Sequence, residues 1–275
     1  MKKIAALILA VMLACTLLVS CGGTGDGGTT TTETPKVTVT RSFLAGYVKD
    51  VSMGGNIVSM NGRVLLNLMS DGTLEAYVAM DAMGSLQTAK YTGTYTLGTN
   101  DEFDETITFT YSYGEGESAT VTDKVILDGT FATPFHMVTS MTSTDVEFFE
   151  TAPVNAEGDI FVGFLQKEGG MGKMTYAYAV CLKDDGKFTV SIMQMAPAMG
   201  MHVWGASNGT YAVDGEKITF TYNVVGEEGE IVSENFVSEG TGYSEKGFSA
   251  GFNISQASVK ASAAAFLKVN KKQKI

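Results

Sequence analysis

The chain is poor in the residues that usually carry catalysis or covalent cross-links. Its 275 residues include three cysteines, four prolines, two histidines and one tryptophan. The segment 247–251, Gly-Phe-Ser-Ala-Gly, matches the G-x-S-x-G nucleophile motif, but both histidines precede it, whereas that motif needs a later one. No P-loop, Cys-x-x-Cys or His-Glu-x-x-His pattern occurs. We therefore expect a protein that is not an enzyme and that needs no cofactor.

Positive charge is also scarce. Nineteen Lys and Arg residues face thirty Asp and Glu residues, and the formal net charge is −11. A chain with this balance repels polyanions at ordinary ionic strength. We expect no nucleic acid partner, while cationic ligands, metal ions or plain solubility are all compatible with the charge.

The first twenty residues have the order of a secretory leader. Lys2 and Lys3 form a basic start, and the apolar run that follows is shorter than the roughly 20 residues that a membrane-spanning helix needs. It ends in Leu-Val-Ser-Cys at 18–21, which resembles the lipobox of bacterial lipoproteins. The resemblance implies that residues 1–20 are removed as a signal peptide and that lipid is attached to Cys21.

A polar segment rich in glycine and threonine follows the cysteine. Such a composition cannot bury a core, so residues 21–40 are expected to be the lipid anchor and a flexible linker. The chain is then expected to face the periplasm or the exterior from the cell membrane or outer membrane, with the membrane as a partner through its lipid. Cys181 is left without a disulfide partner and is expected to be buried and unreactive.

The body of the chain repeats itself at a spacing of 111 to 117 residues. The segment 107–111, Ile-Thr-Phe-Thr-Tyr, recurs letter for letter at 218–222. Weaker matches keep the same order along the chain: Gly46-Tyr47 with Gly163-Phe164, Met83-Gly84 with Met199-Gly200, Gly93-Thr94-Tyr95 with Gly209-Thr210-Tyr211, Phe131 with Phe248, Phe135 with Phe252, and Phe149 with Phe266. This period is too long for a solenoid repeat. We expect two homologous domains, 41–152 and 153–275.

Within each domain the apolar residues alternate with polar ones, as in half-buried strands, and Asp-Gly pairs punctuate the runs. Only 261–267 is ambiguous between helix and strand. The second domain contains eight candidate strands, near 160–166, 174–182, 188–195, 208–213, 217–225, 233–239, 247–254 and 262–269.

The order of these strands predicts an all-β fold. Eight short sequential strands suggest two tandem antiparallel up-and-down β-barrels, because closure removes exposed edges. The Gly-aromatic first strand, the Asp-Gly turn and the Gly-Thr-Tyr and Ile-Thr-Phe-Thr strands resemble lipocalin-like small barrels of bacterial lipoproteins, although Tyr47 and Phe164 replace that family's usual tryptophan. β-Sandwiches, or one sheet system shared by both halves, are the alternatives.

Two sets of residues are candidates for binding. Met and aromatic side chains could line a barrel mouth: Met83, Met199, Tyr176, Tyr178 and Trp204. The second set is Met199, Met201 and His202, because thioethers and an imidazole suit Cu(I). Adaptable core packing explains the methionines equally well.

Three functions therefore remain open for the sequence. The first is a non-enzymatic envelope lipoprotein that binds a small apolar ligand or a partner protein through its duplicated barrels. The second is a soft-metal, Cu(I)-binding protein of the envelope. The third is a purely structural envelope module.

Overall fold

A computed structural model describes residues 36–53, 55–138, 143–169, 172–225, 231–253 and 262–270. The predicted signal peptide, the lipid-bearing Cys21 and most of the linker lie outside these residues. Residues Val37–Ile275 form one compact unit. Among the described residues, no helix is long and apolar enough to cross a membrane.

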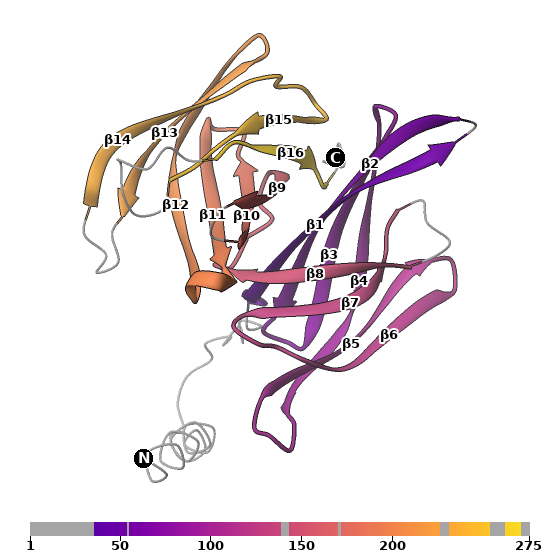
Figure 1. Cartoon of the computed structure of the whole chain (residues 1–275). Helices are drawn as coiled ribbons and strands as arrows, with labels where there is room; N and C mark the ends of the chain where they lie inside the picture. The colour runs from indigo at the N-terminus through magenta and orange to yellow at the C-terminus, as the bar shows by residue number, and fades with distance from the viewer. Residues whose placement is uncertain are drawn as a thin grey trace, which may run out of the picture. The chain divides into compact units, whose positions relative to one another are not determined.

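The first eight strands form one antiparallel sheet (Figure 1). They are β1 (Val39–Met53), β2 (Asn56–Met69), β3 (Thr73–Ala82), β4 (Ser85–Thr99), β5 (Glu105–Gly114), β6 (Glu117–Val125), β7 (Thr130–His136) and β8 (Ser143–Thr151). Their order across the sheet is β6-β5-β4-β3-β2-β1-β8-β7. Consecutive strands of this sheet therefore pair with each other, except that β6 does not pair with β7. In addition, β8 pairs with β1.

The second eight strands repeat this order as β14-β13-β12-β11-β10-β9-β16-β15. They are β9 (Asp159–Gly169), β10 (Gly172–Leu182), β11 (Lys187–Ala196), β12 (Met201–Asp214), β13 (Lys217–Val225), β14 (Ile231–Gly240), β15 (Gly247–Ala250) and β16 (Ala264–Lys268), with one short 3-10 helix at Pro197–Met199. All eight predicted strands are present, and the ambiguous segment is the strand β16. The predicted all-β fold of two tandem eight-stranded units is confirmed, with one nearly closed barrel and one half-barrel.

Equivalent hydrogen bonds recur in the two halves. The hydroxyl of Tyr95 donates to the carbonyl of Met69 at 2.9 Å, and that of Tyr211 donates to the carbonyl of Lys183 at 2.9 Å. Both tyrosines belong to the repeated Gly-Thr-Tyr segment and fasten the fourth strand of their sheet to the end of the second. The repeat therefore preserves specific contacts as well as strand order.

The sequence match of Phe149 with Phe266 was wrong by one residue. The β7–β8 hairpin places Phe131 opposite Phe148, and the β15–β16 hairpin places Phe248 opposite Phe266. The counterpart of Phe266 is therefore Phe148, and Phe149 points to the opposite face of its sheet. Because side chains alternate along a strand, a shift of one residue exchanges the inner and outer faces.

The match of Gly46 to Gly163 contains the same error. A Cβ at Gly163 would overlap the ring of Phe266, inside the second barrel. A Cβ at Gly46 would instead overlap the ring of Phe164, which belongs to a separate core on the outer face of the sheet. The true counterpart of Gly163 is Ala45, one residue earlier.

Side chains fill the interior of each barrel. In the first barrel the rings of Tyr111 and Phe135 stack with centroids 4.7 Å apart. In the second, Phe248 and Phe266 stack at 4.6 Å. These rings lie among fully buried aliphatic residues of the neighbouring strands. The described interiors are thus packed cores, which is one of the two ways in which an eight-stranded barrel can use its inside.

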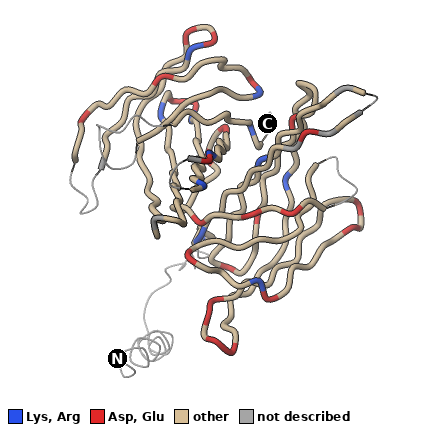
Figure 2. Tube along the Cα trace, viewed as in Figure 1, with Lys and Arg blue, Asp and Glu red and all other residues tan. Residues whose placement is uncertain are grey.

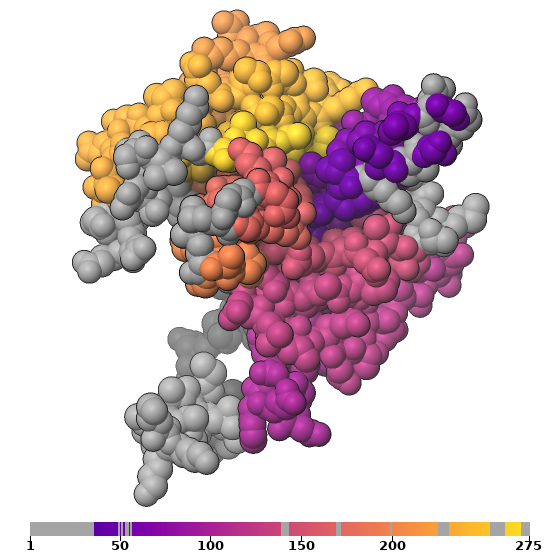
Figure 3. Space-filling model, viewed as in Figure 1, coloured from indigo at the N-terminus to yellow at the C-terminus, as the bar shows by residue number. Residues whose placement is uncertain are grey.

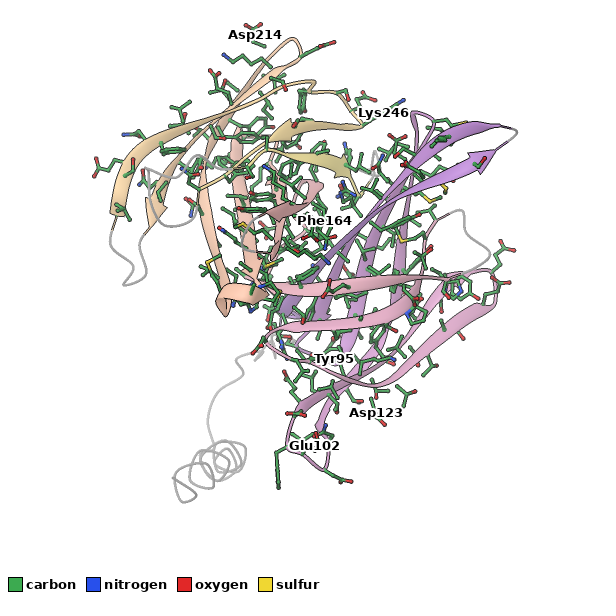
Figure 4. All side chains as sticks on the ribbon, in the orientation of Figure 1. Tyr95, Glu102, Asp123, Phe164, Asp214 and Lys246 are labelled. Atoms are coloured by element: carbon green, nitrogen blue, oxygen red, sulfur yellow. The ribbon has the colours of Figure 1, made fainter. Side chains whose placement is uncertain are left out.

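A third core joins the outer faces of the two barrels. It contains Leu44, Leu65 and Phe149 from the first half and Val162, Phe164 and Met193 from the second, among others. Strands at this junction are buried on both faces, which explains unbroken apolar runs such as 64–66 and 177–182. Figure 3 shows the strands of the two halves in direct contact, and Figure 4 labels Phe164 between them.

The junction is reciprocal. β1 contacts β9, which is its counterpart in the second half. β1 also contacts β10, and β2, the counterpart of β10, contacts β9 in the same way. Likewise β8 contacts β11, and their counterparts β16 and β3 contact each other. Contacts made by single residues are reciprocal in the same way. The turn before β7 meets His202 through Gly129, and the loop before β15 meets the β3–β4 turn through a 2.5 Å hydrogen bond from Lys246 to Gly84. Such reciprocity is the mark of a two-fold, isologous interface.

Charge lies mostly at the ends of the hairpins. Figure 2 shows acidic residues at the tip between β4 and β5, where Asp101 and Glu102 are exposed. Among the described residues, no group of three or more His, Cys, Asp or Glu side chains lies together to hold a metal ion. Cys181 is buried, and burial raises the pKa of its thiol, so its thiolate is suppressed in the folded state.

Candidate functional site

The gap in the first sheet opens from a tight turn. Leu127 and Thr130 exchange backbone hydrogen bonds of 2.9 and 2.8 Å across Asp128-Gly129, whose positive φ angles suit a two-residue hairpin. Beyond this turn no bridge joins β6 to β7, although the structure describes every residue from 117 to 136. The two strands therefore diverge from the turn and leave a seam between them.

A β-bulge bends β6 where it borders the seam. Phe109 pairs with Val121 and Ile107 pairs with Lys124, so β6 has one residue more than β5 over this stretch. Asp123 takes a positive φ of 45°, and its N–H donates to the Thr108 hydroxyl at 2.9 Å, which holds the bulge toward β5 (Asp123 is labelled in Figure 4). Bulges of this kind redirect side chains and interrupt pairing. The bulge thus helps to keep the seam open.

The seam holds a pocket of about 360 Å³. It is lined by Ala119, Thr120, Val121, Thr122, Lys124, Thr133, Pro134, His136 and Ser143. The lining therefore offers hydroxyl groups, one ammonium group and one imidazole, and it contains no carboxylate. A volume of this size falls at the lower end of the range that small ligands occupy.

The imidazole at the pocket is held in a fixed orientation. The Nδ1 atom of His136 lies 3.0 Å from the hydroxyl of Tyr111, which also accepts the backbone N–H of His136 at 3.1 Å. The Tyr113 ring stacks on the imidazole with centroids 3.7 Å apart and planes 6° apart. Burial raises the pKa of Tyr111, so its hydroxyl is neutral at physiological pH and can serve both bonds.

The equivalent seam of the second barrel, between β14 and β15, contains a larger side chain. Tyr111 pairs with Ala119 in the first sheet, and its counterpart Tyr222 pairs with Phe236 in the second, so Ala119 and Phe236 occupy equivalent positions. The Phe236 ring packs edge-on against Tyr222, with centroids 5.5 Å apart. The larger side chain fills space in the second barrel that the alanine leaves open in the first.

Hydrogen bonds also fasten the second seam. The hydroxyl of Ser238, on β14, donates to the carbonyl of Gly251 just after β15. Thr241 and Ser249 exchange backbone hydrogen bonds of 2.9 Å. In the first barrel Val121 stands in place of Ser238 and has no hydroxyl to donate. The two halves of the repeat thus share a fold and differ at this seam.

The residues predicted to line a ligand pocket are not brought together. Met83 occupies a β-turn and is 76% exposed, and Trp204 is 50% exposed on β12. Tyr178 belongs to the packed core of the second barrel, and Tyr176 packs at its margin. The side chain of Met199 lies outside the described part of the structure.

Of the predicted set Met199, Met201 and His202, only His202 has a methionine directly opposite it, and that methionine is Met195. Met195 lies directly opposite His202, and Met193 lies opposite Trp204 on the same face of β11 and β12. Met201 precedes His202 in the strand, so its side chain points to the other face. The Nε2 atom of His202 is buried and has no hydrogen-bond partner among the described residues. Met195 thus replaces Met201 beside the imidazole.

Ser249 of the G-x-S-x-G segment lies inside β15, opposite Ala265 of β16. Its backbone is paired on the other side with Thr241. The nucleophile motif requires a sharp turn from a strand into a helix, which this position does not have.

The seam was not predicted from the sequence, although a signal for it exists. The repeated segments indicate what the two halves share, whereas Ala119 in one half and Phe236 in the other are a difference between them. No known protein family, curated protein or solved structure matches the chain.

Proposed function

We propose that the chain is a lipid-anchored extracytoplasmic binding protein without enzymatic activity, which holds a small ligand in the seam of its first barrel. The observation that carries this proposal is the contrast between the equivalent seams, one filled by Phe236 and the other left with a pocket beside Ala119. The rest of each barrel is packed, so the ligand is bound between strands and not in a central cavity.

The anchor rests on the sequence around Cys21. The lipobox-like residues support attachment to the cell membrane or outer membrane, with the barrels facing the periplasm or exterior. Incorporation of labelled palmitate that disappears in Cys21→Ala tests this part of the proposal.

Filling the seam is expected to abolish ligand binding. Ala119→Phe gives the first barrel the side chain that occupies this position in the second, so small molecules that bind the wild-type protein should lose at least about tenfold in affinity. Ligand-observed NMR with a library of small organic compounds measures this loss. The matched control is Ala132→Phe, an exposed position on β7 that does not line the pocket. Equal binding by wild type and Ala119→Phe would contradict the proposal.

A second candidate function, soft-metal binding, is favoured by the pairing of Met195 with His202. A thioether beside an imidazole nitrogen that has no hydrogen-bond partner is a suitable start for a Cu(I) site. Titration with Cu(I) against a competing chelator should then show at least about tenfold weaker binding for Met195→Leu and for His202→Leu. Met201→Leu, on the opposite face, should bind as the wild type does. Equal affinities for all four proteins would exclude the site.

A further inference from the structure

The residues that line the seam pocket also indicate the chemical class of its ligand. We propose that the pocket binds a small aromatic anion, with the ring lying beside Ala119 and His136 and the anionic group at Lys124. This inference rests on the proposed function, because it names the class of ligand for the same site.

The aromatic part of the proposal follows from the walls of the pocket. In the second barrel a phenyl ring, that of Phe236, occupies this position and packs edge-on against Tyr222. In the first barrel the ring is missing, and the imidazole of His136, which lines the pocket, is backed by the stacked ring of Tyr113. The stacked pair Tyr113 and His136 stands where the second barrel has Val224 and Asn253.

A pocket that is lined by the imidazole of His136 and lacks the phenyl ring of the second barrel suits a ring supplied from outside. Rings pack favourably against rings in offset or edge-on arrangements, at about 0.5–1.5 kcal/mol beyond the area that they bury. Thr120, Thr133 and Ser143 add hydroxyl groups at the margin, which can bond polar substituents of the ring.

The anionic part follows from Lys124. Its side chain lines the pocket, no acidic residue does so, and Lys124 forms no ion pair with any of the described residues. The neighbouring carboxylate of Asp123 accepts a 3.0 Å hydrogen bond from Thr108, in the bulge. An ammonium group in a pocket without carboxylates therefore favours a negative ligand group, even though the chain as a whole carries a net charge of −11.

The second barrel offers no such charge. Its β13–β14 pairing has no bulge at the equivalent place, and Ile218, the counterpart of Ile107, pairs with Gly240 where Ile107 pairs with Lys124. Lys124 and the position that lacks a ring, Ala119, thus both belong to the first half of the repeat. Two independent differences at one seam point to one ligand.

The test compares benzoate with benzyl alcohol and acetate as probes of the full chain. His136 and His202 are the two histidines of the chain, so their imidazole NMR signals report the site of binding directly. Benzoate is expected to shift the signals of His136 and to bind about tenfold more tightly than benzyl alcohol, since one hydrogen bond to a charged group distinguishes them. Acetate, which has no ring, is expected to bind no better than benzyl alcohol.

Variants test the ligand class and the proposed function separately. Lys124→Gln should remove the preference for benzoate over benzyl alcohol, Lys124→Arg should retain it, and Ala119→Phe should abolish binding of both probes. Equal affinity of wild type for benzoate and benzyl alcohol, or binding of neither, would overturn the ligand class. Binding that survives Ala119→Phe and shifts His202 instead would overturn the proposed function itself. Thermal unfolding followed by circular dichroism checks that each variant is folded.

Discussion

Phe164→Ala is expected to lower the free energy of unfolding by about 3–5 kcal/mol. The side chain is 7% exposed and lies at the centre of the core between the barrels. Its ring sits over Gly46, where a Cβ would overlap it, and its centroid is 6.0 Å from that of Phe149. Removing the ring therefore leaves a cavity between two rigid sheets, which cannot collapse to fill it.

Urea denaturation followed by circular dichroism measures this loss. The matched control is Phe103→Ala, because Phe103 is 88% exposed at the β4–β5 tip and should change stability by less than about 0.5 kcal/mol. Equal effects of the two substitutions would contradict the assignment of Phe164 to a shared core. In the Phe164 variant the barrels should also unfold less cooperatively, seen as a lower m-value or a second transition.

Arg63→Met is expected to change stability in the opposite direction, raising it by about 1–3 kcal/mol. Arg63 is 2% exposed on β2 and has no carboxylate partner within ion-pair distance among the described residues. Its guanidinium donates to the carbonyl of Gly62 at 2.7 Å and to those of Tyr47 and Ala265 at 3.4 Å, and it lies 5.9 Å from the ring of Phe164. Its Nε has no hydrogen-bond partner among the described residues. The charge is therefore poorly compensated.

Burial lowers the pKa of Arg63 to about 10. Because the folded pKa lies below the unfolded one, the charged form costs about 3 kcal/mol at every pH below 10, and this cost shrinks only as the pH rises above that value. The second barrel has Ala177 at the equivalent position, where it is fully buried. The fold therefore does not require a charge there.

Arg41→Met provides the matched control. The guanidinium of Arg41 donates to Glu150 and Glu105 at 2.6–2.7 Å, so its removal leaves two carboxylates without a partner and should destabilise the protein. Urea denaturation at pH 7 compares the two variants. A loss of stability in both would show that Arg63 contributes favourably, contrary to this prediction.

The strands were predictable because their physical signals are local. Alternating side chains and Asp-Gly turns mark each strand, and the repeat supplies a second copy of every signal, which is why all eight strands of the second half were placed correctly. The side of the sheet on which Phe149 lies was not predicted correctly, because an alignment of two similar sequences can be off by one residue. The pairing of β7 with β8 in the structure corrects it.

The junction and the seam were harder to predict. An apolar run such as 64–66 indicates burial on both faces but does not say what covers the outer one. Met83 was expected at a barrel mouth because it recurs in the repeat, yet it occupies a turn with a positive φ of 55°, where the backbone conformation carries its side chain into solvent. Recurrence in a repeat marks shared architecture, whereas the candidate binding site lies where the copies differ.

The reciprocal junction has a consequence for stoichiometry. In a dimer of identical subunits, every substitution appears twice, so a pocket opened in one subunit is opened in the other. Here both halves belong to one polypeptide, and Phe236 can remain in one while Ala119 stands in the other. Under the proposed function, a pair of related barrels therefore carries one candidate ligand site per polypeptide, and the half with Phe236 supports it through the shared core.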